Sequence, residues 1–224
     1  MSFFSADVSA DAVQESTGGA YLSKSGIYDV TLKIVSVDVN NSGARSLNFN
    51  VDYNGSSSTL YGLRLDNNDK TPNFQAKTFN KLCIVAGVER VSDPEVQSHK
   101  LGKDGIAKDL AVLTDFTDFE CKVRIQEEYS IIPVGKGYNN EGQVKKQLVI
   151  KNFYSATGAS ADELVNDKPI GEQLAKDEAY AANVTYKDGL TAADITAWEA
   201  DKRGGGSSAP APTTTATAGG GLFK

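Results

Sequence analysis

The chain has 224 residues, 40% of them hydrophobic, and a formal net charge of −6. This length and composition suffice for one sizeable core with smaller additional segments. No run of about 18 apolar residues occurs, which argues against a membrane-spanning helix. Residues 1–17 contain three acidic and no basic side chains. They do not resemble a secretory signal peptide, so secretion is not expected.

The negative charge is unevenly distributed along the chain. Residues 1–155 carry 17 basic and 19 acidic side chains, whereas residues 156–224 carry 6 and 10. A net negative charge argues against a nucleic-acid partner, because phosphates are repelled by carboxylates. The first part is nearly neutral, however, and has enough Lys and Arg for a local basic groove.

Three consecutive strands are predicted after an irregular N-terminal arm over residues 1–25. They cover residues 27–39, 45–53 and 58–65. In the second, apolar and polar residues alternate, which gives one buried and one solvated face. Asn54-Gly55 lies between the second and third strands and is typical of a type I′ hairpin turn, which requires positive φ at both central residues.

The first of these strands contains a change of phase. Tyr28, Val30, Leu32 and Ile34 share one face, but from Val35 onward the apolar alternation continues one residue out of step. A β-bulge produces such a shift and bends the strand. A long bent strand is what a small closed barrel requires, because the strand must pair in two places.

A helix is predicted from Phe74, whose apolar face continues through Thr78, Leu82 and Val85. Gly87 is placed to end it as the C′ glycine. Residues 91–102 are predicted to be a loop. Residues 105–113 are compatible with either a short helix or an extended segment.

Two further strands are predicted over residues 119–126 and 144–154, with a long hairpin loop over residues 127–143. The resulting order is β-β-β-α-β-β. This order favours a mainly β fold, the five-stranded OB-fold barrel, which is a small, partly open Greek-key barrel. An ordinary α+β sheet with the same elements is the alternative. Phe49, Tyr53 and Phe119 are assigned to the core of the predicted domain.

The composition changes after residue 155. Residues 161–165, 170–182 and 192–202 are predicted to form short acidic helices, and Thr191 with Asp194 resembles a capping box. Residues 204–221 contain no charge and no large apolar side chain, which predicts a flexible segment before the apolar tip Leu222-Phe223. The predicted divisions are an arm (1–25), a barrel domain (26–155), an acidic helical extension (156–203) and a tail (204–224).

Residues suited to catalysis or metal binding are sparse. His99 is the only histidine and is predicted to lie on the surface, without a second ligand for zinc. Asp66 and Asp69 are more typical of a turn than of a cation site. Gly135-Lys136-Gly137 lacks the strand-to-helix context of a phosphate-binding loop. We therefore expect no enzymatic activity, no metal and no cofactor. Cys83 and Cys121 lie in apolar contexts and are expected to be buried free thiols, as in a reducing cytoplasm, although a disulfide is the alternative.

A binding surface is better supported. Proteins that bind single strands combine cations that follow the phosphates with aromatic rings on which bases stack. The last two strands and their loop supply most such groups, although alternating cations on a strand can also be no more than its solvated face. Simple alternation places Tyr61 on the opposite side of its strand from Arg64. The candidate residues for binding single-stranded DNA are Arg45, Tyr61, Arg64, Lys122, Arg124, Tyr129, Lys136, Tyr138, Lys145 and Lys151.

Several of these segments together resemble a known family. They are residues 24–30 (KSGIYDV), the turn at 41–45 with the strand at 47–51 (LNFNV), Asn54-Gly55, and residues 81–88 (KLCIVAGV). Over about residues 22–154 the chain resembles bacteriophage single-stranded DNA-binding proteins of the OB-fold type. Glu128-Tyr129 and residues 138–140 also look like that family's last hairpin.

The resemblance implies sequence-independent binding and protection of single-stranded DNA during phage replication, recombination or repair, in the cytoplasm of the infected bacterium. It also implies a C-terminal tail that recruits replication or recombination proteins, for which Leu222 and Phe223 are the candidates. The chain departs from that pattern because it ends in Lys224 and its acidic residues lie upstream, at 162–201. An OB-fold interaction or assembly module that docks a partner through this tail is the alternative. A nuclease is a remote third possibility.

Overall fold

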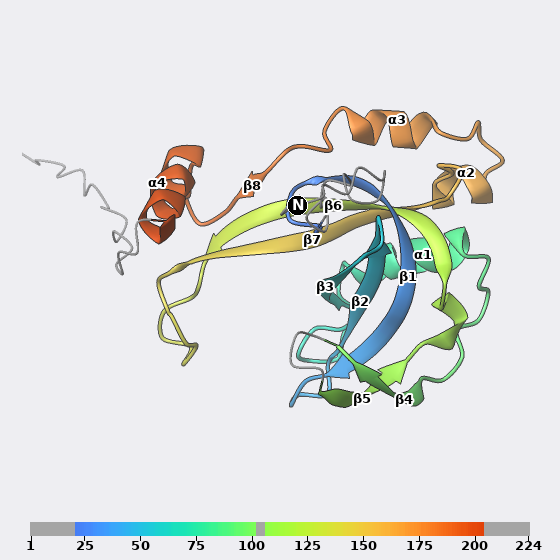
Figure 1. Ribbon diagram of the computed structural model, residues 1–224, viewed down its shortest axis with the longest axis horizontal. Helices are drawn as coiled ribbons and strands as arrows, with labels where there is room; N and C mark the ends of the chain where they lie inside the picture. The colour runs from blue at the N-terminus through green and yellow to red at the C-terminus, as the bar shows by residue number, and fades with distance from the viewer. Residues whose placement is uncertain (1–20, 102–105, 204–224) are drawn as a thin grey trace, which may run out of the picture. The chain divides into compact units, whose positions relative to one another are not determined.

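The computed structural model describes residues 21–101 and 106–203 (Figure 1). The chain divides into two compact units. Unit 1 comprises the described residues within 1–126 and 148–182, and unit 2 those within 127–147 and 183–224. The expected acidic extension is thereby divided, with its first two helices in unit 1 and its last in unit 2. Leu222 and Phe223 lie outside the described residues, so the tail stays a prediction.

Three antiparallel strands open unit 1, as predicted. They are β1 (Gly26–Val39), β2 (Arg45–Tyr53) and β3 (Ser56–Arg64), with β1 paired to β2 and β2 to β3. Asn54 and Gly55 have φ values of +50° and +74°, which confirms the tight turn between the second and third strands.

A bulge in β1 is confirmed, slightly earlier than the phase change predicted at Ile34-Val35. The register with β2 shifts between Leu32 and Ile34, leaving Lys33 as the extra residue. The segment before the bulge pairs with β6 (Phe119–Ile131), and the segment after it pairs with β5 (Ala107–Val112) at Ser36 and Val37. The bend therefore lets one strand serve two neighbours along the same edge, and Figure 1 shows the curved blue ribbon that results.

Helix α1 (Ala76–Val85) ends as predicted at Gly87, whose φ is +68°. The amide of Gly87 donates to the carbonyl of Ile84, and that of Val88 donates to the carbonyl of Cys83. These two bonds form a Schellman motif. The helix begins two residues later than expected, however, so Phe74 precedes it and is exposed rather than buried.

Replacing Gly87 with alanine is expected to lower the free energy of unfolding by about 1–2 kcal/mol, because a Cβ disfavours positive φ. No atom lies within 4 Å of the position that this Cβ would take, so the cost comes from the backbone alone. Denaturant unfolding measures the change. Asn80→Ala, on the exposed side of the same helix, is the control and should be neutral or slightly stabilising.

A hairpin that the sequence did not predict follows α1. Strands β4 (Glu95–Lys100) and β5 pair with each other, so the loop prediction for residues 91–102 was wrong. Most of β4 is exposed, including its single apolar side chain, Val96, so no alternation marks it as a strand. Of the two alternatives for residues 105–113, the extended one is confirmed for 107–112. His99 consequently lies in a strand rather than a loop.

The last hairpin is longer than predicted. Strand β6 continues to Ile131 and pairs with β7 (Val144–Ser155), which shortens the connecting loop. The pairing order β7-β6-β1-β2-β3 describes an open, mainly antiparallel sheet, because among the described strands β3 pairs with β2 and β7 with β6, and these two end strands do not pair with each other. The specific five-stranded barrel is therefore not established by these pairings.

The core of unit 1 lies between this sheet and α1. Phe49 of β2 packs on Phe153 of β7, with ring centroids 5.6 Å apart, and both side chains are fully buried. Leu82 of α1 is also fully buried. The core assignment of Phe49 is confirmed, whereas Tyr53 and Phe119 are partly buried against the core. Both cysteines are free, as expected, and Cys121 is buried, whereas Cys83 is only half-buried.

The segment after β7 forms α2 (Ala161–Val165) and α3 (Glu172–Glu178) in unit 1, and β8 (Thr185–Tyr186) and α4 (Ala192–Arg203) in unit 2. The capping box of α4 is confirmed, because Thr191 Oγ1 accepts from the amide of Asp194, and the Asp194 carboxylate accepts from the amide of Thr191. None of the described helices has the length and apolar character needed to cross a bilayer.

Candidate nucleic-acid interface

A second bulge, in β3, places two candidate residues on one side of the strand. Asn48 of β2 lies opposite both Tyr61 and Gly62, and its Oδ1 accepts from the amide of Gly62 at 3.0 Å. The bulge lets Leu60 and Leu63 both be buried, while Tyr61 is 73% exposed and Arg64 is also exposed. The alternation that separated Tyr61 from Arg64 was therefore wrong. Gly62 inside a strand was the available sequence signal.

Phe74, in the segment that follows β3, is a second exposed ring. Its exposure is 79%, among the highest of the large apolar side chains in the described chain. The amide of Asn73 donates to the carbonyl of Leu65, and the amide of Arg64 donates to Gln75 Oε1, each at 2.8 Å. These bonds, one to the backbone of Asn73 and one to the side chain of Gln75, hold the segment around Phe74 against the end of β3. We call Tyr61, Arg64 and Phe74 the β3 platform.

Arg124 is engaged within unit 1. Its Nη1 lies 2.7 Å from Asp177 Oδ1 of α3, and the side chains are only 18% and 13% exposed. Asp177 also accepts hydrogen bonds from the Tyr154 hydroxyl and from Gln173 Nε2. Burial alone would raise the pKa of Asp177, but the bonds from Tyr154 and Arg124 outweigh it and the pKa is lowered. Arg124 thus attaches α3 to β6.

Two other candidate cations of unit 1 are paired within the chain. Lys122 Nζ lies 2.5 Å from Asp29 Oδ1. Arg45 holds Asp66 through two bonds, with Nε 2.6 Å from Oδ2 and Nη2 3.0 Å from Oδ1. The bond from Arg45 lowers the pKa of Asp66. In each pair one partner is mainly exposed and the other mainly buried, with Asp66 11% and Lys122 23% exposed.

Tyr129 forms the core of unit 2 and was wrongly placed in a loop. It lies in β6, is 4% exposed, and stacks on Tyr186 of β8 with ring centroids 5.9 Å apart. Trp198 of α4 meets the same ring edge-on at 6.1 Å, and the Tyr129 hydroxyl donates to Glu199 at 3.3 Å. A ring enclosed in this way is not accessible to a base.

The loop between β6 and β7 in unit 2 is organised by Glu141. Its carboxylate accepts from the amides of Gly135, Lys136, Gly137 and Tyr138, at 2.6–3.2 Å. These four bonds, that from Gly135 foremost, lower the pKa of Glu141. The Gly-Lys-Gly amides therefore already bind an anion, which is a side chain of the same loop. The rings and cations exposed around this hairpin in unit 2 include Lys136, Tyr138 and Lys145.

Replacing Glu141 with glutamine is expected to speed amide hydrogen exchange at residues 135–138, because a neutral amide oxygen is a weaker acceptor than a carboxylate. Lowering the pH of the wild type through the depressed pKa of Glu141 should produce the same loss of protection. Hydrogen exchange followed by NMR measures both. Amides of β2 serve as the control and should be unchanged, while equal exchange in wild type and variant would contradict the assignment.

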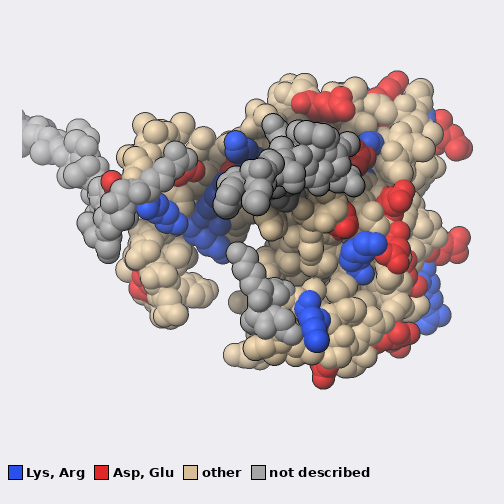
Figure 2. Space-filling model, viewed as in Figure 1, with Lys and Arg blue, Asp and Glu red and all other residues tan. Residues whose placement is uncertain are grey.

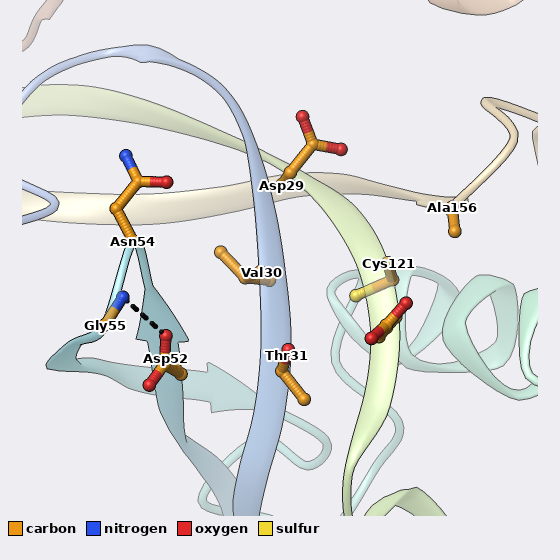
Figure 3. A pocket seen from close by; sticks show the side chains of 9 residues that line it. Asp29, Val30, Thr31, Asp52, Asn54, Gly55, Cys121 and Ala156 are labelled. Atoms are coloured by element: carbon orange, nitrogen blue, oxygen red, sulfur yellow. Dashed lines mark hydrogen bonds between the residues drawn. The ribbon is translucent and has the colours of Figure 1, made fainter.

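Two cavities in unit 1 differ in charge. The first, of about 210 Å³, is lined by Asp29, Asp52 and Glu120, and none of its lining residues is basic (Figure 3). The second, of about 390 Å³, has Lys81 of α1, Arg124 and Lys151 in its wall, and polar residues from the α2 and α3 segments close it. Only the second is suited to a phosphate.

The distribution of charged side chains does not by itself mark an interface on the face shown in Figure 2. Figure 2 shows abundant acidic side chains on the face that it presents, with basic side chains dispersed among them.

Among the residues that the structure describes, no three His, Cys, Asp or Glu side chains are grouped to hold a metal ion. The structure thus joins Tyr61 with Arg64, and Arg124 with Lys151, but it places Tyr129, Lys136, Tyr138 and Lys145 in the other unit.

Comparison with known proteins does not assign the chain to a family. A scan against protein-family models and a search of curated proteins both found no match.

Proposed function

We propose that this protein binds and protects single-stranded DNA, independently of sequence, during the replication, recombination or repair of a phage genome in its bacterial host. The observation that carries the proposal is the β3 platform. It contains two aromatic rings, 73% and 79% exposed, and an exposed arginine, and hydrogen bonds tie the segment around Phe74 to the end of β3. Leaving large apolar rings in water is unfavourable, and stacking on bases would remove that cost.

The chemistry of the platform suits a single strand better than a duplex. Tyr61 and Phe74 offer faces on which any base can stack, so no sequence preference is required. Arg64 offers a planar cation for a phosphate. In a duplex the base faces are already stacked on one another, so these rings would have no base to receive.

The strand arrangement supports a barrel of the OB type as the scaffold. Strand β1 bends to pair with β2 on one edge and with β6 on the other, and α1 follows β3 in the chain. In this proposal the sheet runs β7-β6-β1-β2-β3 around a core and stays open between its first and last strands, with β4 and β5 as an added hairpin. OB-type barrels use a face and its loops to bind oligonucleotides.

A salt-titrated binding measurement tests the function directly. We expect the full-length protein to bind oligo(dT) of about 16 nucleotides at low salt, and the logarithm of affinity to fall linearly with the logarithm of salt concentration, because bound phosphates release counterions. Duplex DNA of equal length and single-stranded RNA are the comparison ligands. Absence of oligo(dT) binding at low salt would refute the proposal, and equal affinity for duplex DNA would refute base stacking.

A further inference from the structure

Helix α1 has an unusual charge for this protein. Its ten residues include Lys77 and Lys81 and no acidic side chain, although the chain as a whole carries a net charge of −6. Both lysines are exposed. The helix is therefore a local concentration of positive charge next to the β3 platform.

The position of these lysines is not explained by the stability of the helix. The positive end of a helix dipole is at the N-terminus, so acidic side chains are favourable in the first turn and basic ones in the last. Helix α1 has no acidic residue in its first turn and no basic residue in its last, and Lys77 is its second residue. A lysine there is mildly unfavourable for the helix, which favours a role toward a ligand.

The exposed side chains of this segment form one stripe. Lys77, Lys81 and Ile84 are spaced by three or four residues in the helix and are exposed, and the exposed Phe74 lies in the turn just before it. Leu82 is buried on the other side, and Val85, one turn after Lys81, is buried at the edge of the stripe. Lys77 and Lys81 are one turn apart, about 6 Å along the helix axis. The stripe thus carries a ring at its start and two cations in succession.

The stripe connects two features of unit 1. At one end Phe74 belongs to the β3 platform. Two helical turns further along, Lys81 lines the cavity of about 390 Å³, together with Arg124 and Lys151. The two carboxylates in that wall are paired within the chain, Asp162 with Lys168 at 2.6 Å and Asp177 with Arg124 at 2.7 Å. Their charges are thereby offset, and the lysines give the path its positive character.

We propose that single-stranded DNA continues from the β3 platform along α1, with Lys77 and Lys81 binding phosphates and the cavity beside Lys81 receiving the end of the bound segment. This track rests on the proposed function. It extends the interface away from the second hairpin, where the sequence had placed most of the contacts, and it assigns a role to two lysines outside that prediction.

The double variant Lys77→Ala/Lys81→Ala tests the track in the full-length protein. Loss of two phosphate contacts should reduce the salt-dependence slope for a 16-nucleotide oligo(dT) by about 1.4, since each contact with a single strand contributes about 0.7. A shorter oligo(dT) of about 6 nucleotides, near the lower end of OB-fold site sizes, should lose less affinity because the platform suffices for it. The matched control is Lys100→Ala/Lys108→Ala on the β4–β5 hairpin, which removes the same charge from exposed positions elsewhere in unit 1.

Protection of lysines from an amine-reactive reagent gives a second readout. The 16-nucleotide oligo(dT) should protect Lys77 and Lys81 and leave Lys100 and Lys108 reactive. Equal slopes for the two double variants, or unprotected Lys77 and Lys81 in a saturated complex, would overturn the track and leave the platform intact. Failure of the wild type to bind either oligonucleotide would instead refute the proposed function.

Discussion

Replacing Tyr61 and Phe74 together with alanine is expected to weaken oligo(dT) binding by about 30-fold or more. Stacking of one base on an aromatic ring is worth about 1–3 kcal/mol, so two rings contribute at least about 2 kcal/mol, and each 1.4 kcal/mol corresponds to a factor of ten. The loss should be similar for all sequences and should leave the salt slope nearly unchanged, because the rings do not contact phosphates. Fluorescence anisotropy at fixed salt measures it.

This double variant separates binding from folding. Both rings are mainly exposed, and surface substitutions usually alter stability by less than about 0.5 kcal/mol. Tyr61→Phe retains the ring and should bind nearly as the wild type does. Tyr180→Ala removes another ring of unit 1, 60% exposed, and should also have no effect. Unchanged affinity of the double variant, with a binding wild type, would show that bases do not stack on the β3 platform.

Replacing Asp177 with alanine is expected to lower the free energy of unfolding by about 3 kcal/mol, because it leaves Arg124 mostly buried and without its carboxylate. The same change deprives the Tyr154 hydroxyl and Gln173 of their acceptor. Denaturant unfolding gives the value. Arg124→Ala should be comparably destabilising, and the double variant Arg124→Ala/Asp177→Ala should cost less than the sum, as a coupled pair requires.

The pH dependence of this pair has a defined sign. The folded-state pKa of Asp177 is lowered, so its contribution to stability is complete above the unfolded value of about 3.9 and is lost as the pH falls through the folded value. The difference in unfolding free energy between wild type and Asp177→Asn should therefore be constant near neutral pH and shrink in acid. A difference that persists below the folded pKa would contradict the role of the charge.

The same pair changes how a loss of DNA binding in an Arg124 variant is interpreted. The sequence placed Arg124 among the phosphate contacts, whereas in the structure it attaches α3 to β6. Weaker binding by Arg124→Ala can thus arise from partial unfolding. Lys122 offers a cleaner test, since its partner Asp29 is 78% exposed and remains solvated when the lysine is removed.

Local backbone features were predictable from the sequence because neighbouring residues determine them. Positive φ at Asn54, Gly55 and Gly87, the presence of a bulge in β1 and the capping box at Thr191 each depend on a few consecutive side chains or on hydrophobic periodicity. Strand β4 was missed because it is exposed, so no periodic pattern is imposed on it. The bulge at Gly62 was missed because alternation was continued through a glycine.

Which candidate residues are accessible was decided by the tertiary structure. Arg124 and Asp177 are 53 positions apart, and Tyr129 meets Trp198 across an even longer stretch of chain, so no local pattern reports either contact. A cation on a solvated strand and one that anchors a helix have the same spacing in the sequence. By itself the sequence determined the mainly β character, the turns and the supply of rings and cations. Only long-range packing decided that Tyr61, Arg64 and Phe74 are exposed together, because burial depends on what the rest of the chain places against each side chain.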